Sequence, residues 1–185
     1  AEVVGFNDDT VILMPYSSLK DIAPGCLVEG TGKPLEVKAG PELIGKVLDA
    51  LGNPYDGFSL PRGLKTIPTA QEPPNTLTRP PINERIEVGV KAIDAMLTCG
   101  KGQRVGIFAG SGVGKSTLLG MIARNTSAQL NVIALVGERG REVLEFIERD
   151  LGPEGLSRSI VVAATSDQPA LMRIKAAFTA TAIAE

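Results

Sequence analysis

The sequence contains no histidine and no tryptophan, and aromatic residues make up only 4% of its 185 residues. The lack of histidine argues against a zinc site, because Cys26 and Cys99, the two cysteines, lie far apart and form no metal-binding cluster. The scarcity of aromatic side chains argues against a stacking surface for single-stranded nucleic acid. We expect both cysteines to be buried, reduced thiols of a cytosolic protein.

The chain also lacks an excess of charge and a long apolar run. It has 19 basic and 21 acidic residues, so its net charge is −2 and no global positive field attracts nucleic acid or anionic lipid. No apolar run approaches the roughly 18 residues that a membrane-spanning helix needs. The chain starts at Ala1 inside a strand-like run, so the absence of a leader says nothing about targeting.

The first part of the chain alternates short β-type runs with turn residues, which predicts a small antiparallel barrel or sheet. Six prolines between Pro61 and Pro81 then favour an extended linker. We therefore expect a partial N-terminal β-barrel over residues 1–70 and a proline-rich linker over 71–81. The expected strands are AEVVGF (1–6), TVILMPYS (10–17), CLVEG (26–30) and a run within LIGKVLDALG (43–52).

From residue 82 to residue 185 the pattern alternates between amphipathic helices and continuous apolar strands. Such alternation predicts an α/β domain with a doubly wound parallel sheet, whose strands are buried on both faces. The expected helices cover residues 84–99, 115–126, 141–151 and 169–185, and the expected strands cover 103–108, 131–136 and 158–165.

The run AGSGVGKS (109–116) lies between an expected strand and an expected helix. Gly110, Gly112 and Gly114 permit backbone torsions that turn successive N–H groups towards one anion, and the helix that follows adds its positive dipole end. Lys115 supplies a full positive charge for the β and γ phosphates, and the Ser116 hydroxyl is suited to Mg²⁺. The sequence therefore predicts a phosphate-binding loop for a nucleotide.

A second charged segment, GERGRE (137–142), directly follows the expected strand 131–136. Ligands of open α/β sheets bind at the carboxyl edge, where this segment must lie. Glu138 is suited to orient an attacking water, and Arg139 to contact a phosphate oxygen through two hydrogen bonds. The spacing alone fits a solvated charged loop at the start of a helix equally well.

Three blocks, FAGSGVGKSTLLGMIAR, VIALVGERGREVLEFIERDLG and RSIVVAATSDQPALMR, occur in this order. Together they resemble the flagellum-specific protein export ATPases and the related type III secretion (injectisome) ATPases. Catalytic subunits of rotary ATP synthases are similar at a greater distance. The resemblance implies an ATPase with a RecA-like P-loop domain after an N-terminal β-barrel. It implies that Glu138 is a catalytic glutamate, that Ser116 serves Mg²⁺, and that ATP is bound by Gly110, Ser111, Gly112, Val113, Gly114, Lys115, Ser116 and Thr117. From their chemistry and position we also expect Lys115 and Arg139 to be catalytic.

The same resemblance implies a homohexamer at the cytoplasmic face of the export apparatus, peripheral to the membrane export gate. Its expected partners are the apparatus regulator and stalk proteins, export substrates and their chaperones, with no nucleic acid among them. In the family, a second acidic strand motif, an arginine that acts in trans and a helical C-terminal domain follow the position of Glu185. The resemblance thus implies that the RecA-like domain is partial here, truncated at its C-terminus, and that this chain alone is inactive.

Three alternatives stay open at this point. The same ATPase could serve an injectisome instead of a flagellum. A RecA-like helicase or transcription terminator is more remote, because it needs an RNA-binding front domain rich in exposed aromatic and basic residues, and the pattern of residues 1–60 does not indicate such a domain. A non-hydrolysing regulatory subunit of a rotary ATPase is the third, and the presence of Lys115 and Glu138 argues against it.

Overall fold

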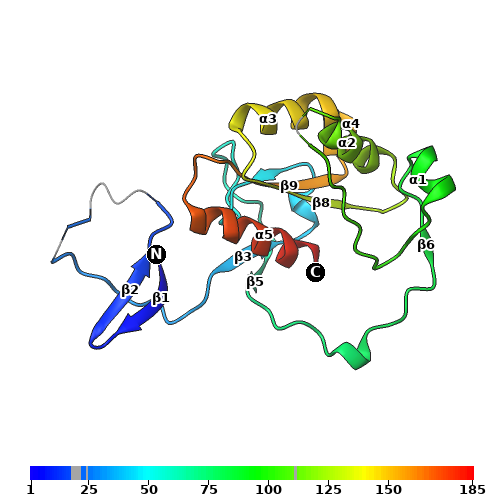
Figure 1. The fold of residues 1–185 in the computed structure, drawn as a ribbon. Helices are drawn as coiled ribbons and strands as arrows, with labels where there is room; N and C mark the ends of the chain where they lie inside the picture. The colour runs from blue at the N-terminus through cyan, green and yellow to red at the C-terminus, as the bar shows by residue number, and fades with distance from the viewer. Residues whose placement is uncertain (18–21, 24, 111) are drawn as a thin grey trace.

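A parallel sheet of three strands forms the centre of the computed structural model, which describes residues 1–17, 22–23, 25–110 and 112–185 (Figure 1). Its strands are β4 (Val47–Leu48), β9 (Ser159–Ala164) and β8 (Asn131–Val136), in that order across the sheet. Strands β8 and β9 pair in register over their whole length. The expected α/β fold with a parallel sheet is confirmed.

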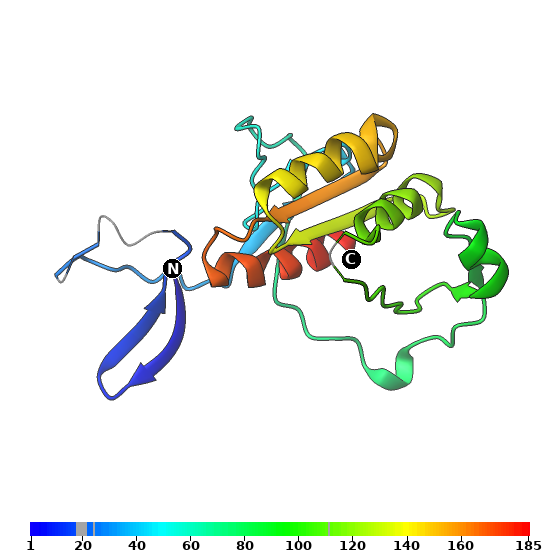
Figure 2. The ribbon, with the colours of Figure 1, turned by 45° about the horizontal axis from the view of Figure 1, so that its top comes forward.

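Helices cover both faces of this sheet (Figure 2). Every residue of β9 is buried, and its side chains alternate between the two faces, as a strand with two buried faces requires. Ile160, Val162 and Ala164 pack with α5 (Ala170–Ala184), while Val161 and Ala163 pack in the opposite core cluster. The elements of that opposite layer are α2 (Lys115–Asn125), α3 (Gly140–Glu145), the π-helical turn η3 (Phe146–Leu151) and α4 (Gly152–Leu156).

The N-terminal part contains two antiparallel strand pairs, as its alternating pattern predicts. Strand β1 (Glu2–Asn7) pairs with β2 (Thr10–Met14), and β3 (Glu36–Ala39) pairs with β5 (Lys65–Pro68). The expected strand at residues 26–30 is not formed. The run at 43–52 contributes the short 3₁₀ turn η1 (Pro41–Leu43) at its start and then β4, which joins the parallel sheet. The barrel itself and the division at residues 70 and 81 stay predictions.

Small elements connect the two parts. They are the 3₁₀ turn η2 (Thr76–Thr78), β6 (Arg85–Ile86), α1 (Lys91–Met96) and β7 (Cys99–Gly100), and β6 pairs with β7. The helix expected over 84–99 is therefore much shorter than predicted. Gly89 explains the late start, because its left-handed φ of 75° interrupts the helical backbone and a Cβ there would collide with Asn125.

The strand expected directly before the phosphate loop, at residues 103–108, is not formed. A strand is stable only when its N–H and C=O groups pair with a neighbour. Among the described residues, no strand pairs with this segment, and all pairing in the parallel sheet involves β4, β8 and β9. The side chains of Val105 and Phe108 are consequently exposed.

An ion pair ties the N-terminal hairpin to the sheet domain. Lys175 of α5 lies 2.8 Å from Glu2 of β1, and Tyr16 donates a hydrogen bond of 3.3 Å to the same carboxylate. Burial, followed by the charge of Glu2, raises the pKa of the Tyr16 hydroxyl.

In the described part of the chain no helix combines the length and apolarity that a membrane crossing requires. Cys99 is buried as expected, whereas Cys26 is exposed, contrary to the expectation.

Candidate functional site

The glycine loop takes the shape that its sequence predicts at two of its three glycines. Gly112 and Gly114 have left-handed φ values of 75° and 95°, and Gly114 is the N-cap of α2. The backbone of Gly110 does not use this region. A Cβ at any of the three would meet nothing within 4 Å, so open space lies beside each of these glycines. Ser111 lies outside the described residues.

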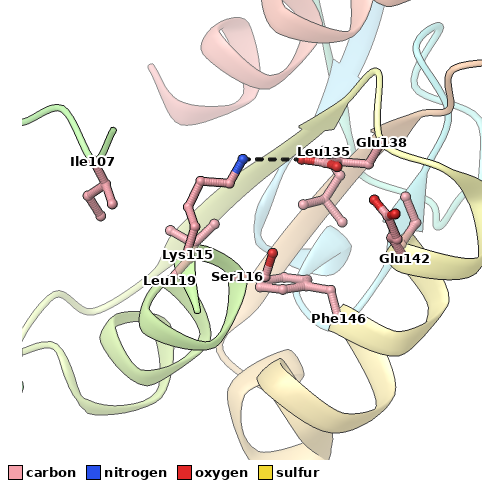
Figure 3. Close-up of a pocket in the computed structure, with 9 residues that line it drawn as sticks. Ile107, Lys115, Ser116, Leu119, Leu135, Glu138, Glu142 and Phe146 are labelled. Carbon is pink, nitrogen blue, oxygen red and sulfur yellow. Dashed lines mark ion pairs between the residues drawn. The ribbon is translucent and has the colours of Figure 1, made fainter. Parts of the chain in front are cut away.

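Two charged groups face each other across this space. The Lys115 Nζ lies 3.8 Å from Glu138 Oε1, and both side chains are partly exposed (Figure 3). Lys115 begins α2, and Glu138 follows β8 after Gly137, whose φ is 77°. The backbone carbonyl of Glu138 accepts a hydrogen bond of 2.9 Å from the Ser166 N–H, which fixes the carboxylate loop to the end of β9.

Two cavities meet at this pair. The smaller, of about 200 Å³, has polar walls formed by Lys115, Ser116, Glu138 and Glu142 and a floor of apolar side chains that includes Phe146 (Figure 3). The larger, of about 390 Å³, follows the phosphate loop. It is lined by Gly110, Gly112, Gly114, Lys115, Ser116, Thr117, Glu138, Glu142, Glu145 and Asp150.

Three carboxylates of the larger cavity were missed by sequence reasoning: Glu142, Glu145 and Asp150. A signal for the first two was available, because Glu142 and Glu145 are three residues apart on the helix that follows Glu138. Asp150 carried no such signal, because its place at the site depends on the packing of η3 against α2. In the described ranges no group of three or more Asp, Glu, Cys or His side chains could hold a metal ion.

Two of the expected site residues lie away from the cavities. The Arg139 side chain is 76% exposed and pairs with Glu142 at 3.5 Å. It does not line either cavity, and neither does Val113, which is also exposed. The structure thus brings Lys115, Ser116 and Thr117 together with Glu138, and the role of Arg139 stays a prediction.

Polar side chains continue along the carboxyl edge of the sheet beyond Glu138. Gln168 donates a hydrogen bond of 3.3 Å to the Tyr55 hydroxyl. Partial burial raises the pKa of Tyr55, and this effect outweighs the hydrogen bond from Gln168, which lowers it. A hydrogen bond from Thr165 lowers the pKa of Asp167. These residues belong to the loops after β4 and β9, so the ends of all three strands meet at one polar edge.

These features define a nucleotide-binding α/β domain of the phosphate-loop class. They are a glycine loop at the start of a helix, a lysine on that loop, and a carboxylate at the end of the next strand. The family model of the ATP synthase alpha/beta family, nucleotide-binding domain, matches residues 89–185, just over half of the chain. The chain belongs to this family.

Relatives with assigned names match the whole chain. It is 68% identical over 185 residues to the flagellum-specific ATP synthase of Bacillus subtilis and 50% identical to the type 3 secretion system ATPase of Xanthomonas euvesicatoria. It spans 42% of the length of each. Among solved structures, the assembled ATPase EscN in complex with its central stalk EscO, from enteropathogenic E. coli, superposes with a TM-score of 0.89. That match has 46% identity and covers 99% of this chain and 45% of EscN.

Proposed function

We propose that the full-length protein hydrolyses ATP and that this reaction energises protein export through a flagellar type III secretion apparatus. The observation that carries the chemical part is the approach of Lys115 to Glu138 across the phosphate loop, at 3.8 Å. The biological part is supported by relatives of several bacteria that are named flagellum-specific ATP synthases, at 68% identity in Bacillus subtilis and 51% in Treponema pallidum.

The loop binds the phosphates of ATP through three kinds of positive group. The left-handed backbone at Gly112 and Gly114 allows their N–H groups to turn towards the anion, and the N-terminus of α2 directs its dipole to the same place. Lys115 then adds a full charge at the terminal phosphates, and its hydrogen bonds to phosphate are charge-assisted. When ATP enters, these phosphates replace Glu138 as the partner of Lys115 and leave the carboxylate free.

The oxygen groups of the site suit Mg²⁺ that arrives with the nucleotide. The Ser116 hydroxyl lines both cavities and would hold the ion together with phosphate oxygens. The ion would neutralise charge that develops on the phosphates. Because the described residues contain no metal cluster of their own, the site fits a cation shared with the substrate rather than one held by protein alone.

Glu138 orients the water that attacks the terminal phosphate. Its loop is held by backbone hydrogen bonds to the end of β9, from Gly137 N–H to Ala164 O at 2.7 Å and from Ser166 N–H to Glu138 O. Such rigidity matters because a positioned base contributes only when its oxygen meets the water in the correct geometry. Arg139 is proposed to reach a phosphate oxygen after release from its ion pair with Glu142.

We further propose that the full-length protein forms a homohexamer with sites at subunit interfaces, at the cytoplasmic face of the export gate. Its proposed partners are regulator and stalk proteins, export substrates and chaperones. The structural match to EscN, described as an assembled ATPase in complex with its central stalk, supports the assembly and the stalk partner. An injectisome ATPase is the second candidate, favoured by the same structural match and by the Xanthomonas relative.

Deletion of the gene in the source bacterium separates these two candidates. The flagellar proposal predicts that flagellar subunits are no longer secreted, that swimming is lost, and that the wild-type gene on a plasmid restores both. A plasmid copy with Lys115→Ala should fail to restore them, because phosphate binding is lost. Normal swimming together with loss of needle-type substrates from the medium would replace the flagellar proposal with the injectisome one.

The 185-residue chain by itself is expected to bind ADP or ATP weakly and to show no ATPase rate above background. No arginine is among the described residues that line the two cavities. An arginine supplied by a neighbouring subunit contributes about 10³–10⁵ in turnover to phosphoryl-transfer enzymes. A phosphate-release assay on the chain and its Lys115→Ala variant checks this. Lysine-dependent turnover within about tenfold of the full-length protein would show that the site is self-contained.

A further inference from the structure

One face of α2 packs unusually closely on the π-helical turn η3. Ser116, Gly120 and Ala123 lie on this face at helical spacing, and Gly120 and Ala123 are buried. A Cβ on Gly120 would lie 2.5 Å from the carbonyl oxygen of Asp150 and 2.8 Å from its carbonyl carbon. These are backbone atoms, so no side-chain rotation could make room for it. The contact therefore requires glycine at position 120.

The backbone on the other side of this contact is itself fixed. In η3 the Gly152 N–H bonds to the carbonyl of Ile147, five residues earlier, which is the pattern of a π turn. Phe146 and Leu151, the two ends of η3, are 3% and 0% exposed and belong to one core cluster. Phe146 also lines the smaller cavity together with Ser116 (Figure 3). Short π turns of this kind are rare and often occur at functional sites.

The two halves of the candidate site are held by different parts of the fold. Glu138 is bonded through its backbone to the end of β9, whereas Lys115 and Ser116 belong to α2. In the part of the chain that is described, the segment 103–108 before the loop joins no sheet and does not fix α2 to β8 or β9. The C-terminal end of α2 is tied to β8 by a hydrogen bond of 2.8 Å from the Asn131 side chain to the Ala123 carbonyl. The separation of Lys115, at the N-terminal end, from Glu138 then depends on how closely α2 approaches η3 at Gly120.

We propose that the contact between Gly120 and the backbone of Asp150 sets the gap between the phosphate loop and the carboxylate loop, and that Gly120 is a positioning residue for ATP hydrolysis. This inference rests on the proposed function. A side chain at position 120 would move α2 away from η3, and the loop would move with it. Nucleotide would still be held by the loop and Lys115, but its terminal phosphate would shift relative to Glu138.

The test is Gly120→Ala in the full-length protein. Turnover is expected to fall about 10- to 100-fold while the Kd for MgADP changes less than about threefold, since a displacement near 1 Å costs about this much in rate. In a Glu138→Gln background the same change should cause no further loss, because no carboxylate remains to be positioned. Wild-type turnover, or a loss that is undiminished in that background, would overturn the inference.

Thermal unfolding gives a readout that does not depend on activity. Alanine normally stabilises a helix relative to glycine, so a loose contact would raise the Tm of Gly120→Ala. We expect its Tm to fall. Gly140→Ala is the matched stability control, because a Cβ there makes only an ordinary contact of 3.9 Å with Thr165, and its Tm should not fall. A rise in both variants would contradict the tight contact.

A second variant keeps the test possible if Gly120→Ala does not fold well. Phe146→Leu removes the aromatic ring at the start of η3. This variant is also expected to lose turnover while it keeps its affinity for nucleotide. Unchanged turnover in this folded variant would also overturn the inference. Failure of the proposed function is distinguishable, since it would appear as MgADP binding that does not depend on Lys115.

Discussion

Lys115→Ala in the full-length protein is expected to reduce ATP turnover to background and to weaken nucleotide binding roughly 10- to 100-fold, the value of a hydrogen bond to a charged group. The lysine heads α2 and faces the cavity, and its ammonium group is partly exposed beside Glu138. Its removal takes away the strongest positive charge at the terminal phosphates. Phosphate release and equilibrium titration with a fluorescent nucleotide measure the two effects.

The fold should survive this substitution, because the Lys115 side chain is 48% exposed and packs in neither core cluster. Lys101→Ala is the matched control. This substitution also removes one ion pair, between Lys101 and Glu84 at 2.7 Å, but Lys101 lies outside both cavities. The turnover of the Lys101→Ala variant should therefore stay normal. Preserved turnover and an unchanged KM in Lys115→Ala would refute the assignment of the loop.

Glu138→Gln is expected to slow hydrolysis hundreds of times while MgATP still binds. Glutamine keeps the shape of the side chain and removes the charge that orients water, a contribution of about 10²–10⁴ in rate. The lost ion pair with Lys115 is partly exposed, so little stability should depend on it. Steady-state phosphate release and MgATP titration of the variant are the two measurements.

Glu148→Gln supplies the control for this change of charge. Glu148 is an exposed acidic residue of η3, close in sequence to the site but absent from the lining of both cavities. Its turnover should match that of the unmodified protein. If Glu138→Gln loses MgATP affinity along with turnover, Glu138 belongs to the magnesium or structural shell instead.

The sheet domain was predictable from sequence where the pattern is local. The apolar runs at 131–136 and 158–165 became β8 and β9, and the periodic segments at 115–126 and 169–185 became α2 and α5. Because parallel strands end at the same edge, the sequence also placed Glu138 near the phosphate loop, and the ion pair with Lys115 confirms that proximity.

What could not be predicted depends on partners that are distant in sequence. The run at 103–108 has the apolar content of a strand but no neighbour to pair with among the described residues. Strand β4 (Val47–Leu48) pairs in parallel with β9, which lies more than a hundred residues away in sequence. It therefore belongs to the parallel sheet and not to the antiparallel N-terminal part in which it was expected. From the sequence, Gly120 cannot be distinguished from an ordinary helix position. Glycine is needed there because the backbone of Asp150, which is distant in sequence, lies against it in the folded protein.

We propose that Lys115 holds the phosphates while Glu138 drives their cleavage. Rapid mixing of MgATP with the full-length protein, followed by acid quench, tests it most directly, because it counts ADP formed before product release. Glu138→Gln is expected to bind MgATP in an amount comparable to the unmodified protein and to leave it uncleaved over the time that the unmodified protein needs for its first turnover. A burst of ADP at the unmodified rate in this variant would contradict the proposed role of Glu138 in cleavage, since Glu138 would then act after cleavage.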